Sequence, residues 1–119
     1  VITVVGCGGD RDKGKRPLMA GIACQFSDQV IFTSDNPRSE DPNSIIEDMQ
    51  KGVEPIDYKK TVAIPNRKEA IKMAVSMAHP GDILLIAGKG HENYQIIGEE
   101  TFPFDDMEVL NETLKVLDK

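Results

Sequence analysis

Short apolar runs alternate with amphipathic stretches along this chain. Unbroken runs rich in branched residues predict buried strands at residues 1–5, 29–33 and 83–87, with a shorter strand at residues 61–64. The run at 83–87 is the most apolar, so we expect it to form a strand in the core. This alternation of strands with helical stretches is typical of an α/β domain with a mostly parallel sheet.

Residues that favour helix starts occur at four places. They are Pro17, Asp41 with Pro42, Asn66 with Glu69, and Asp105 or Asp106. Apolar residues at helical spacing then predict the sides that face the core. These are Leu18, Ile22, Ala23 and Phe26, with Cys24 as a small core residue; Ile45, Ile46 and Met49; Ile71, Ala74, Val75 and Ala78; and Val109, Leu110, Leu114 and Leu117.

The chain departs from this alternation near its end. Residues 94–97 and 99–104 are both strand-like, and Gly98 lies between them. A glycine between two such runs favours a tight turn. We therefore expect a hairpin or an antiparallel edge strand next to the parallel sheet.

Length and charge narrow the class of protein. A chain of 119 residues fits one domain, and its net charge of -6 argues against a nucleic-acid or anionic-membrane surface. No apolar run approaches the roughly 20 residues of a membrane span, and no signal peptide is visible. The chain opens inside a strand-like run without Met, so we expect it to be a piece of a longer protein.

Cysteine spacing gives no indication of a metal site. Cys7 and Cys24 are too far apart in sequence to form one of the usual ligand pairs. Two free cysteines fit a reducing cytoplasm.

Three polar loops follow predicted strands, and in an open parallel sheet such loops line one edge. The first loop, residues 6–11, is rich in glycine. It does not match G-x-G-x-x-G, because Arg11 occupies the third glycine position, and it is not a Walker A loop. The basic residues around it fit either an anion site or a solvated loop. They are Arg11, Lys13, Lys15 and Arg16.

The second loop is Asp35-Asn36-Pro37-Arg38. Pro37 stiffens it and holds Asn36 extended. A carboxylate, an amide and a guanidinium held together match a zwitterion, with Asp35 for an ammonium and Arg38 for a carboxylate. The alternative is a turn before a helix with an exposed ion pair, which would contribute little. The residues alone leave both interpretations open.

The third loop is residues 88–92, directly after the most apolar strand. Gly88 and Gly90 allow a backbone to approach a ligand closely. Lys89, His91 and Glu92 add ionisable groups, although His91 has no visible partner as a general base. A β-turn with solvated charges is the alternative.

Taken together, these stretches resemble the C-terminal domain of the Mur ligases. The match is to the subgroup that adds meso-diaminopimelate to UDP-N-acetylmuramoyl-L-alanyl-D-glutamate. It rests on GCGGDRDKGKRPLM, TSDNPRSEDP, DILLIAGKGHENYQ and FDD, in this order and at this spacing. The resemblance covers nearly the whole chain.

The resemblance implies a Rossmann-like three-layer domain spanning residues 1–119, the last of three domains in a cytoplasmic enzyme of peptidoglycan synthesis. ATP and Mg²⁺ would be bound mainly by the absent central domain, and the isolated domain would be inactive. The partners implied are meso-diaminopimelate, the UDP-linked dipeptide and ATP. We expect a monomer that binds neither nucleic acid nor membrane.

The resemblance also assigns residues to the amino-acid site. Asp35, Asn36, Pro37 and Arg38 match the diaminopimelate-recognition sequence, Arg11, Gly88 and Glu92 match further substrate positions, and Asp10 matches an aspartate near the nucleotide. No catalytic or metal-binding residue is assigned.

Diaminopimelate differs from lysine by a carboxylate beside the distal amine, which Arg38 would bind. Lysine-adding relatives depart from the motif at this arginine. The alternatives are a lysine-adding sister ligase and a free-standing α/β module that binds a small molecule without catalysis.

Overall fold

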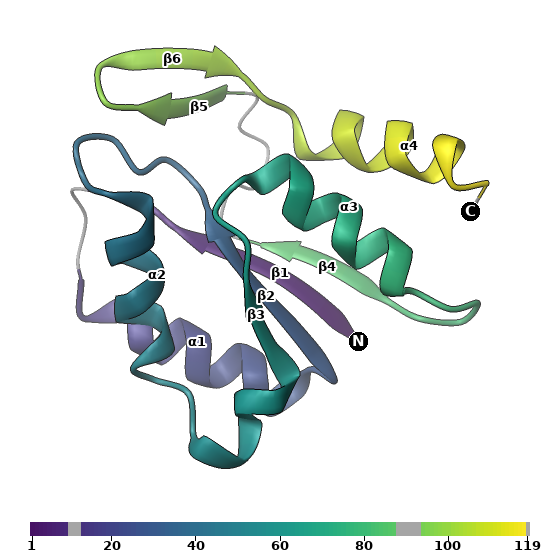
Figure 1. The fold of residues 1–119 in the computed structure, drawn as a ribbon, viewed down its shortest axis with the longest axis horizontal. Coiled ribbons are helices and arrows are strands. Elements are labelled where there is room, and N and C mark those ends of the chain that lie inside the picture. The colour runs from purple at the N-terminus through teal and green to yellow at the C-terminus, as the bar shows by residue number, and fades with distance from the viewer. Residues whose placement is uncertain (10–12, 88–93, 119) are drawn as a thin grey trace.

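A four-stranded parallel sheet organises the fold (Figure 1). The computed structural model describes residues 1–9, 13–87 and 94–118. Its strands are β1 (Ile2–Cys7), β2 (Gln29–Ser34), β3 (Thr61–Ala63) and β4 (Leu84–Ala87), in the order β3-β2-β1-β4. Every residue of β1 is buried, as expected for a central strand covered on both faces.

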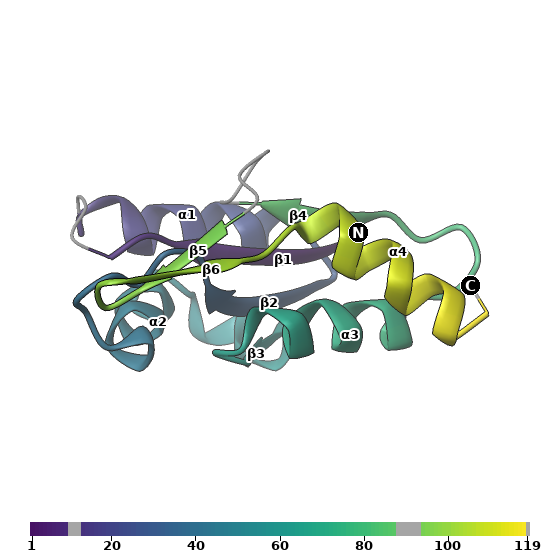
Figure 2. The same ribbon diagram turned by 90° about the horizontal axis from the view of Figure 1, so that it is seen from above.

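Helices cover both faces of the sheet, and Figure 2 shows α1 and α3 on opposite sides of the strands. The helices are α1 (Lys15–Phe26), α2 (Pro42–Gln50), α3 (Arg67–Met77) and α4 (Asp106–Val116), with a short 3-10 helix, η1 (Pro55–Lys60), before β3. On the face of α1 and α2, Phe32 of β2 packs in one cluster with Cys24 and Met49. On the other face, Ile31 packs in a cluster with Ile71, and α4 adds half-buried leucines.

Three of the four predicted helix starts are confirmed by side-chain caps, whereas α1 begins at Lys15, two residues before the expected Pro17, and its N-cap Gly14 has no side chain to cap it. The carboxylate of Asp41 accepts a hydrogen bond from the Asn43 amide at 2.9 Å. Asn66 accepts from the amide of Glu69 at 3.0 Å, and Asp105 begins α4 in the same way. Each cap satisfies an amide that has no partner inside its helix.

The C-terminal hairpin is also confirmed. β5 (Tyr94–Ile97) and β6 (Glu100–Pro103) pair antiparallel, and Gly98 turns between them with φ +63°. The hairpin is separate from the main sheet, but Ile97 forms a bridge with Arg38 in the loop after β2. The expected α/β fold, three-layered and Rossmann-like with a mostly parallel sheet, is therefore confirmed.

The orientation of α1 differs from the expected one. Leu18, Ile22 and Phe26 lie outside, with exposed fractions of 66%, 58% and 71%. The buried residues are Arg16, Ala20 and Cys24. A Cβ atom on Gly21 would lie 3.0 Å from the carbonyl oxygen of Gly52, so α1 passes close to the backbone beyond α2. That close approach favours small residues on the inner side of the helix.

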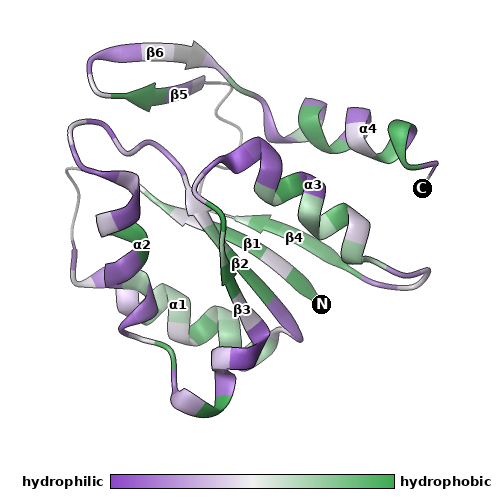
Figure 3. Cartoon of the chain, viewed as in Figure 1, coloured by the Kyte–Doolittle hydropathy of each residue, from purple (hydrophilic) through white to green (hydrophobic). Residues whose placement is uncertain are grey.

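The place of β4 also differs from the expectation. Among the described strands it lies at the edge of the sheet, although Figure 3 shows it as hydrophobic along its length. Leu84 and Ile86 pack against the cluster under α3 and α4. Successive side chains of a strand point to opposite faces. Leu85 therefore faces the side of α1, where it is 53% exposed.

The end of α4 carries a smaller correction. Leu117 was expected to face the core, but it follows the last residue of the helix and is 41% exposed.

Candidate functional site

The parallel register places the starts of the three polar loops side by side. Cys7, the last residue of β1, pairs with Ser34, the last residue of β2. Val5 pairs with Ala87, the last residue of β4. The loops that follow these strands therefore leave the same edge of the sheet, as the sequence predicted. We call this edge the rim.

The loops after β1 and β2 are in direct backbone contact. The amide of Gly9 donates to the carbonyl oxygen of Asn36 at 2.7 Å. A Cβ atom on Gly9 would lie only 1.7 Å from the carbonyl oxygen of Pro37. The glycine is required at this position because two backbones approach each other there.

Replacing Gly9 by alanine is expected to lower the free energy of unfolding by about 1–3 kcal/mol, because the added methyl group forces the two loops apart. Urea denaturation of the variant and the parent measures this change. Lys68→Ala is the control, since it changes an exposed position of α3 away from both loops and should alter the free energy of unfolding by less than about 0.5 kcal/mol. Equal stability of the Gly9 variant and the parent would contradict the expectation.

The β5–β6 hairpin holds the 35–38 loop from the other side. The Ile96 amide donates to the side-chain oxygen of Asn36 at 2.9 Å. The side chain of Gln95 donates to the carbonyl oxygen of Asp35 at 2.8 Å. Asn36 is 1% exposed, so its carboxamide oxygen serves this internal contact. No sequence pattern predicted this contact of Gln95.

Arg38 occupies an unusual backbone conformation. Its φ of +54° lies in the left-handed region, which costs a residue with a side chain about 1–3 kcal/mol. The hairpin compensates, because the Arg38 amide donates to Ile96 and its carbonyl accepts from Gly98. A residue kept in such a conformation by its surroundings is often part of a functional site.

The guanidinium of Arg38 points back to the loop after β1. Its Nη1 donates to the carbonyl oxygens of Gly9 at 3.0 Å and Asn36 at 3.2 Å. Within the described residues, no partner is found for its Nη2 or Nε. Arg38 forms no ion pair with Glu40 or Asp41 there, so the structure does not support the alternative of an exposed ion pair.

Arg16 was expected in a basic loop, either solvated or binding an anion. It is instead 1% exposed and forms ion pairs with Glu40 at 2.9 Å and Asp48 at 3.0 Å. The hydrogen bond to Glu40 raises the pKa of Arg16, and Arg16 lowers the pKa of the Asp48 carboxyl. The anion expected of a basic loop is thus supplied by the protein itself.

A second buried ion pair lies on the opposite face of the sheet. Arg67 is paired with Asp106 through two hydrogen bonds of 2.7 Å. Its Nη1 and Nη2 also donate to the carbonyl oxygens of Ser34 and Ala87, at 2.9 and 3.4 Å. These are the residues from which the second and third loops leave the sheet. The sequence did not predict this contact, because it joins residues 39 positions apart.

Several predicted site residues lie outside the described residues. They are Asp10, Arg11, Gly88, Lys89, His91 and Glu92. The rim brings together Asp35, Asn36, Pro37 and Arg38 with the start of the loop after β1.

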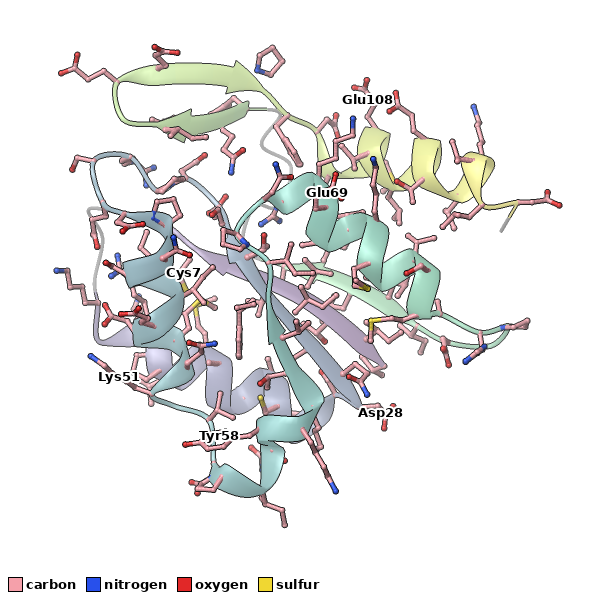
Figure 4. All side chains as sticks on the ribbon, viewed as in Figure 1. Cys7, Asp28, Lys51, Tyr58, Glu69 and Glu108 are labelled. Carbon is pink, nitrogen blue, oxygen red and sulfur yellow. The ribbon has the colours of Figure 1, made fainter. Side chains whose placement is uncertain are left out.

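Two further features are not assigned to the candidate site. Cys7, at the carboxyl end of β1 (Figure 4), is buried, and burial raises the pKa of its thiol. A groove of about 490 Å³ lies between α3 and α4, lined by Met73, Val116 and Leu117 among others. It does not touch the described parts of the three loops, so we do not assign it to the site.

Comparisons with known proteins identify the family and the fold of the chain. The family described as "Mur ligase, glutamate ligase domain" matches residues 1–90. UDP-N-acetylmuramoyl-L-alanyl-D-glutamate--2,6-diaminopimelate ligase of Cytophaga hutchinsonii is 57% identical over 119 residues, which are 100% of this chain and 24% of that protein. The ligase of the same name from Listeria innocua is 62% identical over 106 residues, which are 89% of this chain and 21% of that protein.

A solved structure of a ligase with this name gives a TM-score of 0.92 at 46% identity, covering 99% of this chain and 24% of that one. The chain thus spans about a quarter of the length of the curated relatives it matches. The resemblance found in the sequence is confirmed, and the chain belongs to the Mur ligase family, in its glutamate ligase domain.

Proposed function

We propose that this chain is the C-terminal domain of a longer ATP-dependent ligase. The ligase would add meso-diaminopimelate to UDP-N-acetylmuramoyl-L-alanyl-D-glutamate in peptidoglycan precursor synthesis, and this domain would bind the incoming amino acid. The names of the similar ligases support the reaction. The observation that carries the proposal is Arg38, held rigidly at the rim with part of its guanidinium available.

The chemistry of Arg38 suits the distal end of meso-diaminopimelate. Its planar guanidinium matches a carboxylate through two parallel hydrogen bonds. Lysine has no carboxylate there, so it would leave the arginine unpaired in a closed site. Asp35, which is 8% exposed, is the candidate partner for an ammonium group.

The other predicted residues divide into two groups in this proposal. Asn36 and Pro37 act through their place in the loop, since Asn36 holds the hairpin and Pro37 contacts Gly9. Arg11, Gly88 and Glu92 would complete the amino-acid site, and Asp10 would lie near the nucleotide.

The domain would contribute positioning and charge stabilisation more than acid–base catalysis, and we assign no general base. ATP would activate the glutamyl carboxylate, and the preceding domains would hold ATP and Mg²⁺. The described residues contain no group of three or more His, Cys, Asp or Glu side chains arranged to hold a metal ion. We therefore assign to this part of the chain no Mg²⁺ ligand and no step through the metal.

The surface supports a place in a larger protein. Leu18, Ile22 and Phe26 form an exposed apolar row on α1, and Leu85 is exposed on the same side of the sheet. Single exposed apolar residues are common, but a continuous set indicates a contact surface. We propose three domains, a monomeric state and a cytoplasmic location. Within the described part of the chain, none of the helices has the length and apolar character of a membrane span.

The test is a comparison of kcat/KM for meso-diaminopimelate and L-lysine in the full-length protein. We expect a preference for meso-diaminopimelate of about 30-fold or more, because lysine would leave the charge of Arg38 unpaired once the site is closed. Equal use of the two amino acids would overturn the proposal. A Walker A loop in the sequence before Val1 would distinguish a ligase from a free-standing binding module.

A further inference from the structure

We propose that Arg16 is a positioning residue for Arg38, and that it keeps Glu40 from pairing with Arg38. This inference rests on the proposed function, because it concerns how the amino-acid site is held. Arg16 itself lies at the start of α1, behind the loops, with a side chain that is 1% exposed. It therefore acts through other residues.

The contacts of Arg16 join the two loops on which Arg38 depends. Its Nη1 and Nη2 bind both carboxylate oxygens of Glu40, at 3.0 and 2.9 Å. Nη2 also donates to the carbonyl oxygen of Gly8 at 3.0 Å. The next carbonyl along the chain, that of Gly9, accepts from Arg38. The guanidinium of Arg16 thus fixes two groups near Arg38. One is the Gly8 carbonyl, next in the chain to the Gly9 carbonyl that Arg38 binds, and the other is the carboxylate of Glu40, two residues after Arg38.

This support is needed because the local sequence is not rigid by itself. Gly8 and Gly9 have no side chains to restrict them, and glycine loses more freedom than other residues when it is fixed. Arg38 is held in the left-handed region, which is unfavourable without outside contacts. A planar guanidinium can bind a carboxylate bidentately and a carbonyl at once, whereas an ammonium group offers a single point of charge.

The pairing of Glu40 has an electrostatic consequence as well. Glu40 is the acidic residue closest to Arg38 in sequence, and its amide closes a turn onto Pro37. With Arg16 present, both carboxylate oxygens of Glu40 accept hydrogen bonds from Arg16. Without Arg16, the carboxylate of Glu40 would lose these two hydrogen bonds and could compete with the substrate carboxylate for Arg38.

Arg16→Lys in the full-length ligase tests this. We expect KM for meso-diaminopimelate to rise about 10- to 100-fold, the range for a misplaced binding group, while KM for ATP stays within about twofold. The preference for meso-diaminopimelate over lysine should fall by a similar factor. Arg16→Met should behave alike, and adding Glu40→Gln to it should restore part of the preference.

A control separates positioning from stability. Lys60→Met removes a half-buried cation that pairs with Asp57 at the other end of the sheet, and it should leave the preference unchanged. If a folded Arg16→Lys variant keeps the parent's preference, or if all KM values rise together, Arg16 is only structural and this inference is wrong. If the parent enzyme itself shows no preference, the proposed function fails instead. If the Arg16 variants do not fold, Glu40→Gln alone serves as the test. We expect it to raise KM for meso-diaminopimelate and to lower the preference over lysine, both by smaller factors than the Arg16 variants. If neither value changes, the inference is wrong.

Discussion

Replacing Arg38 by alanine is expected to lower kcat/KM for meso-diaminopimelate by about 30- to 5,000-fold in the full-length ligase, as when one partner of a buried charge pair is removed. The value for L-lysine should change little, because lysine has no carboxylate for this arginine. The preference between the two amino acids should therefore collapse. Steady-state kinetics with both amino acids, at saturating ATP and UDP-linked dipeptide, measures it.

Arg38→Ala separates the loss of substrate recognition from a loss of folding stability. Alanine also carries a Cβ atom, so it occupies the left-handed conformation at a similar cost to arginine. The hairpin contacts of residue 38 are made by its backbone and remain available. Arg38→Lys is the matched control: it keeps the charge, loses the bidentate geometry, and should fall between the parent and the alanine variant. An unchanged preference in Arg38→Ala would exclude this arginine as the selectivity residue.

The largest effect on stability is expected at the other buried arginine. Asp106→Asn should lower the free energy of unfolding by about 3–5 kcal/mol, because it leaves the charge of Arg67 without its carboxylate. The side chains of Arg67 and Asp106 are 0% and 12% exposed, so water cannot replace the lost partner fully. Native-state hydrogen exchange at the central amides of β1 and β2 reports this change for the domain itself.

Glu108→Gln provides the control for this measurement. It removes an exposed acid from the same turn of α4 and should change stability by less than about 0.5 kcal/mol. Exposed ion pairs contribute up to about 1 kcal/mol. If Asp106→Asn lowers the free energy of unfolding by less than this, the ion pair of Arg67 contributes no more than a pair on the surface.

Two buried arginines thus support the rim from opposite faces of the sheet. Arg16 binds the carbonyl of Gly8 and the side chain of Glu40. Arg67 binds the carbonyls of Ser34 and Ala87, where the second and third loops begin. Backbone carbonyls at strand ends have no further partner in the sheet, so a buried arginine satisfies them while it fixes the loops. The site rests on this scaffold and not on the loops alone.

The sequence by itself determined the features that depend on near neighbours. The alternation of apolar runs and helical stretches decided the α/β class, and Asp41, Asn66 and Asp105 marked their helix starts because a cap acts within three residues. The order and spacing of the polar loops identified the family, and with it Arg38 as the candidate for selectivity.

Only the tertiary structure decided which side chains these elements bury and pair. Periodicity placed Leu18 and Ile22 inside, but the close pass of α1 over Gly52 turned the small residues inward instead. The burial of Arg16 and Arg67 could not be predicted from the sequence, because their partners Glu40 and Asp106 lie 24 and 39 residues away. A buried arginine is tolerated only where the fold brings acidic and carbonyl partners to its charge, and a local sequence pattern does not reveal those partners.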